Sequence, residues 1–461
     1  MNEVASQAKL VVRLRQVLGE EKVSTDERDM EDCSRDMADY SGSALAVVKV
    51  ASEEDVVNAV GIANEERVPV VARGAGSSLT GAVVPQKAIV LDMRTLNRVL
   101  KVDTINYYAR VQAGVTLDEL NTELEKYGFF FPPDPASSYI CTVGGAISEG
   151  SGGMRCVRYG TMKDWVVAVR VVLGNGKAVR FGEPLAKNRA GYDLVHLLVG
   201  SEGTLGIITE AYLRILPTPV AVSRRMWVLF GDWESAGRAI AETRKSKIMP
   251  NMIEFLDRVT VSAVNKALQL DLEEAEATLL VDVDEKQLDS LRQIFLGNGA
   301  RKISVAESAE DADRLYQARA WAYVAVKGIA PSVQVEDVVV HIDKLVEFLA
   351  WVKGLAERFE VPIPIVGHAG DGNVHPMILY DNNNPESRSR ANKIFEEICR
   401  YAIRVGGSVT GEHGVGVQKI ALFREQLIAH DGEESLNLMK AIKQLFDPNG
   451  ILNPGKYVEA A

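Results

Sequence analysis

Two short motifs hold three of the six histidines in this chain of 461 residues. The first reads GHAGDGNVH and contains His368 and His375, and the second reads GEHG and contains Glu412 and His413. Seven positions apart, the first two imidazoles would lie about 10 Å apart on a helix and on opposite faces of a strand, and neither arrangement chelates a metal. The turn sequence Gly370–Asn373 can instead fold the chain so that both converge. Two histidines and a carboxylate are a common ligand set for a divalent metal, with positions left open for substrate.

Each motif also has a structural interpretation. A lone buried histidine is usually a hydrogen-bonded core residue, and a Gly-Asp-Gly sequence is usually only a turn. Asn373 and Asp371 could hydrogen-bond to metal ligands, but Asp371 is equally suited to form the turn. The two motifs together favour the functional interpretation.

Three segments contain more glycine than turns alone require: Arg73–Gly81, Gly144–Gly153 and Gly200–Thr209. The first follows a predicted strand, and its exposed backbone N–H groups and hydroxyls suit a pyrophosphate. It is not a GxGxxG fingerprint, because Leu79 stands where the third glycine belongs. The second follows the rigid stretch Pro132–Pro135, and its glycines allow a flat ligand to approach the backbone. Each segment alone could be a turn, whereas the three together indicate a ligand site.

These segments, together with the Lys187-Asn188 pair, Gly191–Leu194 and the terminal Phe446–Gly455, resemble the vanillyl-alcohol-oxidase-like flavoproteins. The resemblance is closest to the branch of FAD-linked D-lactate dehydrogenases and the glycolate oxidase flavin subunit, and it runs from about residue 40 to Gly455. It implies an α+β protein with a two-part FAD-binding domain at residues 1–219. An α+β substrate (cap) domain with an antiparallel sheet would follow at 220–405, and a C-terminal helical segment at 406–461 would return to the flavin and metal site.

The resemblance implies bound FAD. Relatives with covalent flavin carry a histidine near the first glycine-rich segment, and this chain has none before His196, so FAD should be held noncovalently. The family often has an asparagine where this chain has Gly150, which removes one expected polar contact. The positions that match the family's FAD contacts are Arg73, Gly74, Ala75, Gly76, Ser77, Ser78, Gly81, Pro133, Asp134, Thr142, Gly145, Ser148, Gly152, Gly153, Glu202, Gly206, Ile208 and Asn453.

The resemblance also assigns catalytic roles. Positions matching His368, His375 and Glu412 bind Zn²⁺ or Mn²⁺ in the family, and the one matching His413 acts as the base. Arg319 matches the arginine that holds the substrate carboxylate, although it could also be an ordinary solvated helix arginine. These residue types suit oxidation of a 2-hydroxy acid, in which a metal lowers the hydroxyl pKa, a histidine takes the proton and hydride passes to flavin N5.

The implied substrate is a small D-2-hydroxy acid. Relatives that act on 2-hydroxyglutarate carry a lysine near the position of Gln334, so its absence favours a monocarboxylate, D-lactate first and glycolate second. The family usually has proline where His341 stands, and we assign this histidine no role.

Two alternative functions share the same flavin fold. The chain could be a glycolate oxidase flavin subunit that requires partner chains, or an ether-lipid transferase. For the transferase we would expect consecutive histidines, which this chain lacks. A dehydrogenase would pass electrons to a quinone, a cytochrome or a partner protein, and a homodimer is compatible with this function.

The amino-acid composition limits which classes of binding partner and which cellular compartment are expected. Lys plus Arg total 52 against 63 Asp plus Glu, a formal net charge of −11 that argues against nucleic acid as a partner. The four cysteines form no CxxC pair, which argues against a disulfide framework or an iron–sulfur cluster. Neither a signal peptide nor an apolar window of about 18 residues is evident. We therefore expect a cytoplasmic protein that reaches a membrane, if at all, through a partner.

Local signals predict the elements that position these motifs. Ser52 with Asp55 and Thr116 with Glu119 form capping boxes at the starts of two helices. Asn175-Gly176 predicts a β-hairpin. The GNGK sequence at this point resembles a phosphate-binding loop only faintly, and the hairpin turn explains it fully. Beyond Pro219 we expect an antiparallel sheet with helices on one face. Its predicted strands are Val222–Phe230, Met252–Leu256, Thr278–Val283, Arg301–Val305 and Val333–His341.

Overall fold

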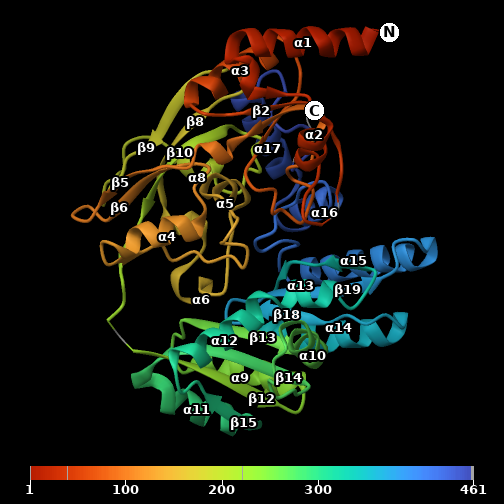
Figure 1. The fold of residues 1–461 in the computed structure, drawn as a ribbon. Coiled ribbons are helices and arrows are strands. Elements are labelled where there is room, and N and C mark those ends of the chain that lie inside the picture. The colour runs from red at the N-terminus through yellow and green to blue at the C-terminus, as the bar shows by residue number, and fades with distance from the viewer. Residues whose placement is uncertain (1, 39, 221, 458–461) are drawn as a thin grey trace. The chain divides into compact units, whose positions relative to one another are not determined.

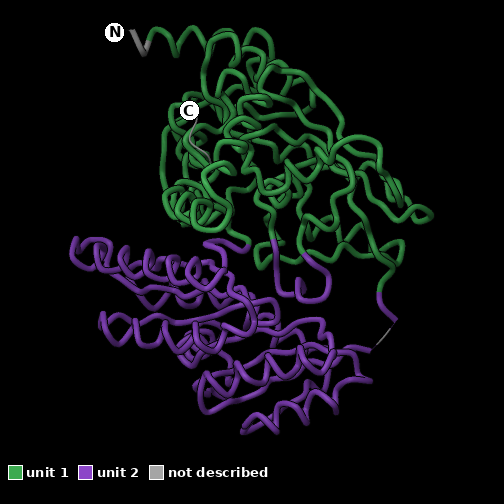
Figure 2. The backbone as a smooth tube through the Cα atoms, turned by 180° about the vertical axis from the view of Figure 1, so that it is seen from behind, with its two compact units in different colours: residues 1–151, 161–218, 412–461 green, residues 152–160, 219–411 purple. Residues whose placement is uncertain are grey.

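The computed structural model describes residues 2–38, 40–220 and 222–457, and the chain packs as two compact units (Figure 2). Unit 1 holds the described residues of Met1–Ser151, Thr161–Thr218 and Glu412–Ala461, and unit 2 those of Gly152–Gly160 and Pro219–Gly411. Unit 2 therefore extends beyond the predicted limit at 405, because Ser408 forms a β-bridge with Val339. In the described chain, no helix combines the length and the hydropathy needed to cross a bilayer.

Unit 1 contains a four-stranded sheet with the order β1-β2-β4-β3, of which strand β2 is labelled in Figure 1. Its strands are β1 (Val23–Ser24), β2 (Ser43–Lys49), β4 (Gln86–Asp92) and β3 (Val70–Arg73), and β2 and β3 pair with β4 in parallel. Helices α1 (Asn2–Leu18) and α3 (Glu53–Glu66) bury apolar side chains with this sheet in one core. The predicted capping box at the start of α3 is confirmed, because Ser52 accepts a hydrogen bond from the Asp55 N–H. The first glycine-rich segment begins at Arg73, so the last strand of this sheet holds its start in place.

A five-stranded antiparallel sheet forms the second part of unit 1. Its strands, in order, are β5 (Val99–Asp103), β6 (Tyr108–Gln112), β10 (Ile207–Arg214), β8 (Val166–Val172) and β9 (Ala178–Gly182). The predicted hairpin between β8 and β9 is confirmed, with Gly176 at φ +77° in its turn. Helix α4 (Leu117–Glu125) begins at the predicted capping box of Thr116, and α5 (Val143–Glu149) is capped by Thr142. The second glycine-rich segment thus starts as a helix, and the third runs into β10.

Unit 2 is built on an eight-stranded antiparallel sheet. Its strands in order are β15 (Ala300–Val305), β12 (Ser223–Phe230), β14 (Ala277–Asp284), β13 (Met252–Asp257), β18 (Ile365–His368), β19 (Asn373–Tyr380) and β16 (Ser332–Val335), with β17 (Val338–Val339) also paired to β19. The sequence therefore predicted most of these strands correctly.

The prediction that helices cover one face of this sheet was wrong. Leu229 packs in a core with α10 (Arg258–Leu268), α12 (Ala309–Ala320) and α13 (Ala322–Lys327). The next residue, Phe230, points to the opposite face and meets Phe295 of α11 (Leu288–Gly297) edge to face. Because strands β13 and β14 are buried on both faces, their apolar runs do not alternate with polar residues as in a half-exposed sheet.

The predicted strand Val333–His341 is broken into β16 and β17. Between them lie Glu336 and Asp337, both completely buried. The break therefore places two consecutive carboxylates inside unit 2, where burial requires that they have polar partners.

A buried ion pair holds the C-terminal stretch on unit 1. Lys443, near the end of α17 (Glu433–Phe446), donates to Asp447 at 2.5 Å. Asp447 also accepts hydrogen bonds from the N–H groups of Ile451 and Leu452. Leu452 forms a parallel bridge with Val70, beside the first glycine-rich segment.

Replacing Asp447 with Ala should lower the free energy of unfolding by about 3–5 kcal/mol, because Lys443 would remain buried without its anion. Urea unfolding followed by circular dichroism measures the change. Glu31→Ala is the matched control, since its pair with Arg35 is exposed and contributes about 0–1 kcal/mol. A loss in Asp447→Ala no larger than in the control would contradict this role of the buried pair.

Candidate active site

A cavity in unit 1 is lined by residues from all three glycine-rich segments and from the C-terminal stretch. The lining residues that the family resemblance assigns to FAD are Arg73, Gly74, Thr142, Gly145, Ser148, Glu202, Gly206, Ile208 and Asn453. Further lining residues, which the family resemblance did not assign to FAD, are Ala72, Ala82, Val83, Met93, Ala113, Gly144, Glu149, Gly203 and Ile207. The cavity therefore gathers segments that are far apart in the chain.

The other residues assigned to FAD do not line this cavity. In unit 1 these are Ala75, Gly76, Ser77, Ser78, Gly81, Pro133 and Asp134, and in unit 2 they are Gly152 and Gly153. Gly81 donates its N–H to Asp36, and Ser78 lies 3.4 Å from the Thr80 hydroxyl, so these contacts stabilise the loop. Their part in FAD binding stays a prediction.

Close packing requires glycine at the start of the first segment. A Cβ on Gly74 would lie 2.3 Å from Thr142 Oγ1, and a Cβ on Gly76 would lie 2.1 Å from Arg73 Nη2. Gly76 also has φ +74°, a conformation that other residues rarely adopt. Arg73 and the glycines beside it thus line a cavity that fits a ligand with a pyrophosphate such as FAD, and the buried Arg73 guanidinium donates a hydrogen bond of 2.7 Å to the Arg35 carbonyl.

The loop that carries Glu412 and His413 is fastened to the first glycine-rich segment. Thr80 Oγ1 donates a hydrogen bond of 3.2 Å to the His413 carbonyl, and the Thr80 carbonyl accepts one of 2.9 Å from the Val417 N–H. Glu412 Oε1 lies 3.8 Å from His413 Nε2. A segment of the cofactor cavity region therefore positions the proposed base.

Glu202 fastens the same loop from the third segment. Its buried carboxylate accepts hydrogen bonds from the N–H groups of Val415, at 2.6 Å, and Gly416, at 2.8 Å. Burial raises the pKa of Glu202 to about 7, although these two N–H groups and the charge of Lys456 act to lower it. Glu202 thus has a structural role in the loop as well as a place in the cavity lining.

Glu149 is a functional candidate that the sequence did not reveal. Burial raises its pKa well above the ordinary value for glutamate, and the charges of Glu202 and Asp36 raise it further. A Cβ on Gly414 would lie 2.7 Å from Glu149 Oε2 and 2.8 Å from Glu202 Oε1, so the two carboxyl groups converge on this glycine. An acidic residue at the end of a glycine-rich helix was the only signal for it.

In unit 2, the histidine motif folds as a hairpin of β18 and β19. Val366 pairs with His375, and His368 pairs with Asn373. His368 lies two residues after Val366, so its side chain points to the same face of the sheet as that of His375. The ring centroids are 5.2 Å apart, as the turn sequence predicted, and Asp371 accepts a hydrogen bond from the Asn373 N–H within the turn.

Glu254 of β13 joins the first histidine to the predicted substrate arginine. It is completely buried, and both of its oxygens lie 2.9 Å from His368 Nδ1. Its Oε2 also lies 2.6 Å from Arg319 Nε in an ion pair. An ionised Glu254 requires His368 to donate from Nδ1, which leaves the lone pair of a neutral imidazole on Nε2. This tautomer is the one that metal ligation by Nε2 requires.

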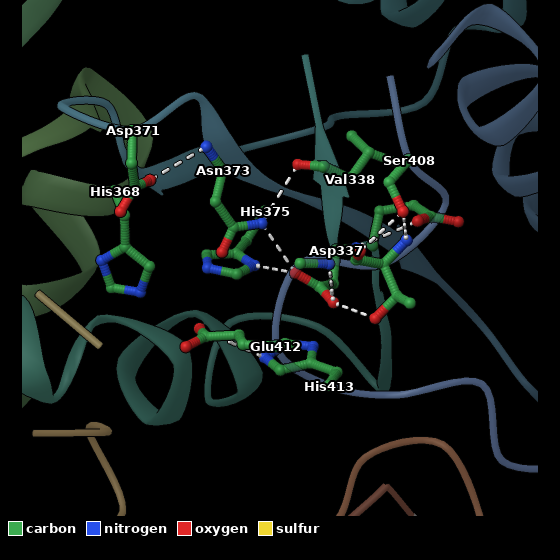
Figure 3. A network of polar contacts seen from close by, with 12 residues as sticks. Asp337, Val338, His368, Asp371, Asn373, His375, Ser408, Glu412 and His413 are labelled. Carbon is green, nitrogen blue, oxygen red and sulfur yellow. Dashed lines mark hydrogen bonds and ion pairs between the residues drawn. The ribbon is translucent and has the colours of Figure 1, made fainter. Parts of the chain in front are cut away.

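Asp337 lies beside the second histidine and accepts hydrogen bonds from the groups around it (Figure 3). Its carboxylate accepts hydrogen bonds from Asn373 Nδ2 at 2.7 Å, from Thr410 Oγ1 at 2.6 Å and from the Gly411 N–H at 2.9 Å. His375 Nδ1 lies 3.7 Å from Asp337 Oδ1. Asn373 therefore supports the motif through Asp337.

Sequence reasoning missed Glu254 and Asp337. The available signal was a carboxylate inside a largely apolar strand, in MIEFLD for the first and VQVEDVVV for the second. Such a residue needs polar partners if the sheet is covered on both faces. That covering was not predicted.

The proposed site residues are divided between the two units. His368, His375 and Arg319 belong to unit 2, whereas Glu412 and His413 belong to unit 1. Glu412 follows directly on Gly411, the last residue of unit 2, so the chain passes from one unit to the other at this motif. Two imidazoles with a supporting carboxylate provide donors that fit a divalent metal.

Two family models and several known proteins match this chain. Residues 220–457 match the family model described as FAD linked oxidases, C-terminal domain, and residues 44–182 match that of the FAD binding domain. The chain is 36% identical to the glycolate oxidase subunit GlcD of Bacillus subtilis, over 90% of this chain and 89% of that protein. It is 35% identical to the D-lactate dehydrogenase of Archaeoglobus fulgidus, over 92% of this chain and 93% of that protein. Among solved structures, p-cresol methylhydroxylase has a TM-score of 0.81 at 19% identity, covering 98% of this chain and 96% of that one, which shows the shared fold alone.

The two raised pKa values in unit 1 predict a loss of stability as the pH rises from about 5 to 8. In the folded state Glu149 and Glu202 hold protons that the unfolded chain releases near its ordinary pKa of 4.5. The two glutamates therefore contribute fully to the free energy of unfolding below the unfolded-state pKa. This contribution is lost as the pH rises through their raised pKa values in the folded state. Glu149→Gln removes one titrating group, so Tm should fall less between pH 5 and pH 8 than in the wild type.

Thermal unfolding of the FAD-loaded protein at several pH values measures this effect. Glu125→Gln is the control, because this side chain is exposed and should leave the wild-type pH dependence unchanged. Identical pH dependence in Glu149→Gln and the wild type would show that the Glu149 carboxyl does not titrate in this range.

Proposed function

Because the chain belongs to the family of FAD-linked oxidases, we propose that it oxidises a small D-2-hydroxy acid to the 2-oxo acid, with D-lactate as the first candidate. Relatives named D-lactate dehydrogenase and glycolate oxidase subunit support a hydroxy-acid substrate. The observation that carries the proposal is the convergence of His368 and Arg319 on the buried carboxylate of Glu254, with His375 beside them. This arrangement provides a cation for a carboxylate next to imidazoles that can hold a metal.

The residues divide the chemistry among them. Arg319 binds the substrate carboxylate, since a guanidinium can grip two oxygens at once. His368, His375 and Glu412 hold a divalent metal, Zn²⁺ or Mn²⁺. His413 takes the proton of the substrate hydroxyl at an imidazole nitrogen. When bound, the metal supplies Lewis acidity toward the hydroxyl oxygen, and FAD supplies a two-electron acceptor.

FAD is held noncovalently in the cavity of unit 1. The buried guanidinium of Arg73 and the backbone of the glycine-rich segments would hold the pyrophosphate. Asn453 donates its side-chain N–H groups to the carbonyls of Glu202, in the third glycine-rich segment, and of Ala82, which directly follows the first, so it joins the C-terminal stretch to both regions.

Glycolate is the second candidate substrate. Gln334 lies on β16, paired with Ile378, at the place where relatives that use 2-hydroxyglutarate have a lysine nearby. A neutral glutamine provides no cation for a second carboxylate, which favours a monocarboxylic acid. A glycolate oxidase subunit would need partner chains for activity, whereas a D-lactate dehydrogenase would reduce a quinone, a cytochrome or an acceptor protein.

Anaerobic mixing of the FAD-loaded protein with D- and L-2-hydroxy acids tests the substrate class. We expect D-lactate, and more weakly glycolate, to bleach the flavin absorbance, and L-lactate and D-2-hydroxyglutarate to leave it unchanged. Flavin that no 2-hydroxy acid bleaches, in protein that carries FAD and metal, would contradict the proposed function.

His368→Ala should lower turnover by on the order of 10³-fold, because loss of a metal ligand removes several kcal/mol of charge stabilisation. The flavin spectrum should stay unchanged, since the cofactor cavity belongs to unit 1. Removal of metal by a chelator should have the same effect and should be reversed by Zn²⁺ or Mn²⁺. His341→Ala is the control, because His341 is exposed and has no proposed role. Full turnover in His368→Ala or in metal-free protein would exclude the metal-assisted reaction.

A further inference from the structure

Glu254 faces His368 across two neighbouring strands. In the antiparallel pair of β13 and β18, Leu256 lies opposite Val366 and Phe255 lies opposite Gly367. The next step of this register brings Glu254 opposite His368, as its contacts with Nδ1 confirm. The backbone of the sheet therefore fixes the distance between this carboxylate and the imidazole.

Arg319 reaches the same carboxylate from helix α12. Its neighbours Leu315 and Ala318 belong to the apolar core that also contains Leu256. The Arg319 side chain is almost completely buried, and its Nε lies 2.6 Å from Glu254 Oε2 in an ion pair that lacks hydrogen-bond geometry. Because a guanidinium has five N–H donors, contact through Nε leaves the N–H groups on both Nη atoms for other partners.

We propose that Glu254 is a positioning residue that couples the metal ligand to the substrate-binding arginine. This inference rests on the proposed function, in which His368 binds metal and Arg319 binds the substrate carboxylate. The Glu254 carboxylate holds the His368 imidazole in the tautomer that has its lone pair on Nε2. The same carboxylate fixes the orientation of the Arg319 guanidinium. The metal and the substrate carboxylate are thus positioned relative to each other by a single side chain that contacts neither.

The charges support this role. A completely buried carboxylate is costly unless cations or N–H donors surround it, and here the guanidinium and the imidazole N–H do so. Glutamine in its place has one acceptor oxygen and one NH₂ group, which would have to face either the His368 N–H or the Arg319 guanidinium. Glu254→Gln therefore loses at least one of the two contacts and leaves Arg319 without its counter-charge.

Metal affinity of the purified, FAD-loaded protein tests the proposal independently of activity. After removal of metal, titration with Mn²⁺ or Zn²⁺ in competition with a chromophoric chelator should give a Kd that is about 10- to 100-fold weaker in Glu254→Gln than in the wild type. The KM for D-lactate should rise in the same variant, and the flavin spectrum should stay unchanged. Asp282→Asn is the matched control, because Asp282 pairs with Arg225 at 3.0 Å in the same sheet, and this variant should retain wild-type metal affinity.

Glu254→Asp gives a second test that keeps the charge. The carboxylate is withdrawn by one methylene group, so metal affinity should fall by a smaller factor, about three- to tenfold. Metal affinity and KM equal to those of the wild type, in whichever of the two variants folds, would overturn the coupling while leaving the proposed function intact. A wild-type protein that binds no metal would instead contradict the proposed ligand set itself.

Discussion

Glu254 lies completely out of water in the middle of the unit 2 sheet, so its negative charge requires partners within hydrogen-bonding distance. The chain supplies His368 from the neighbouring strand and Arg319 from a helix on one face. Asp337 is also completely buried, and its carboxylate accepts hydrogen bonds from N–H and O–H groups near the second histidine. The His368 imidazole is therefore held by a buried carboxylate of the neighbouring strand, and a second buried carboxylate lies beside His375.

Unit 1 uses a related arrangement for its loops. Glu202 holds the backbone that follows His413, and the Glu202 carbonyl accepts a hydrogen bond from Asn453. Thr80 contacts the same loop from the first glycine-rich segment. Glu202, which lines the cavity of unit 1, thus also holds the loop of the proposed base, so a change in the cavity should affect the loop as well.

The proposed reaction needs groups from both units. The cofactor cavity and His413 belong to unit 1, whereas Arg319 and the two histidines of the hairpin belong to unit 2. The chain passes from one unit to the other between Gly411 and Glu412, inside the second histidine motif. This motif is therefore both a source of proposed catalytic groups and a covalent connection between the units.

The sequence by itself determined the local features. Capping boxes, the Asn-Gly hairpin, most strands and the turn that brings His368 toward His375 depend on residues close together in the chain, so their patterns are readable. Residues of all three glycine-rich segments line the cavity of unit 1, where close approach of the backbone requires glycine, and their part in FAD binding stays a prediction. Only the tertiary structure showed that helices cover both faces of the unit 2 sheet, and hence that Glu254 and Asp337 are buried. A carboxylate in a strand looks the same in sequence whether it faces water or a distant arginine, and only long-range packing decides which.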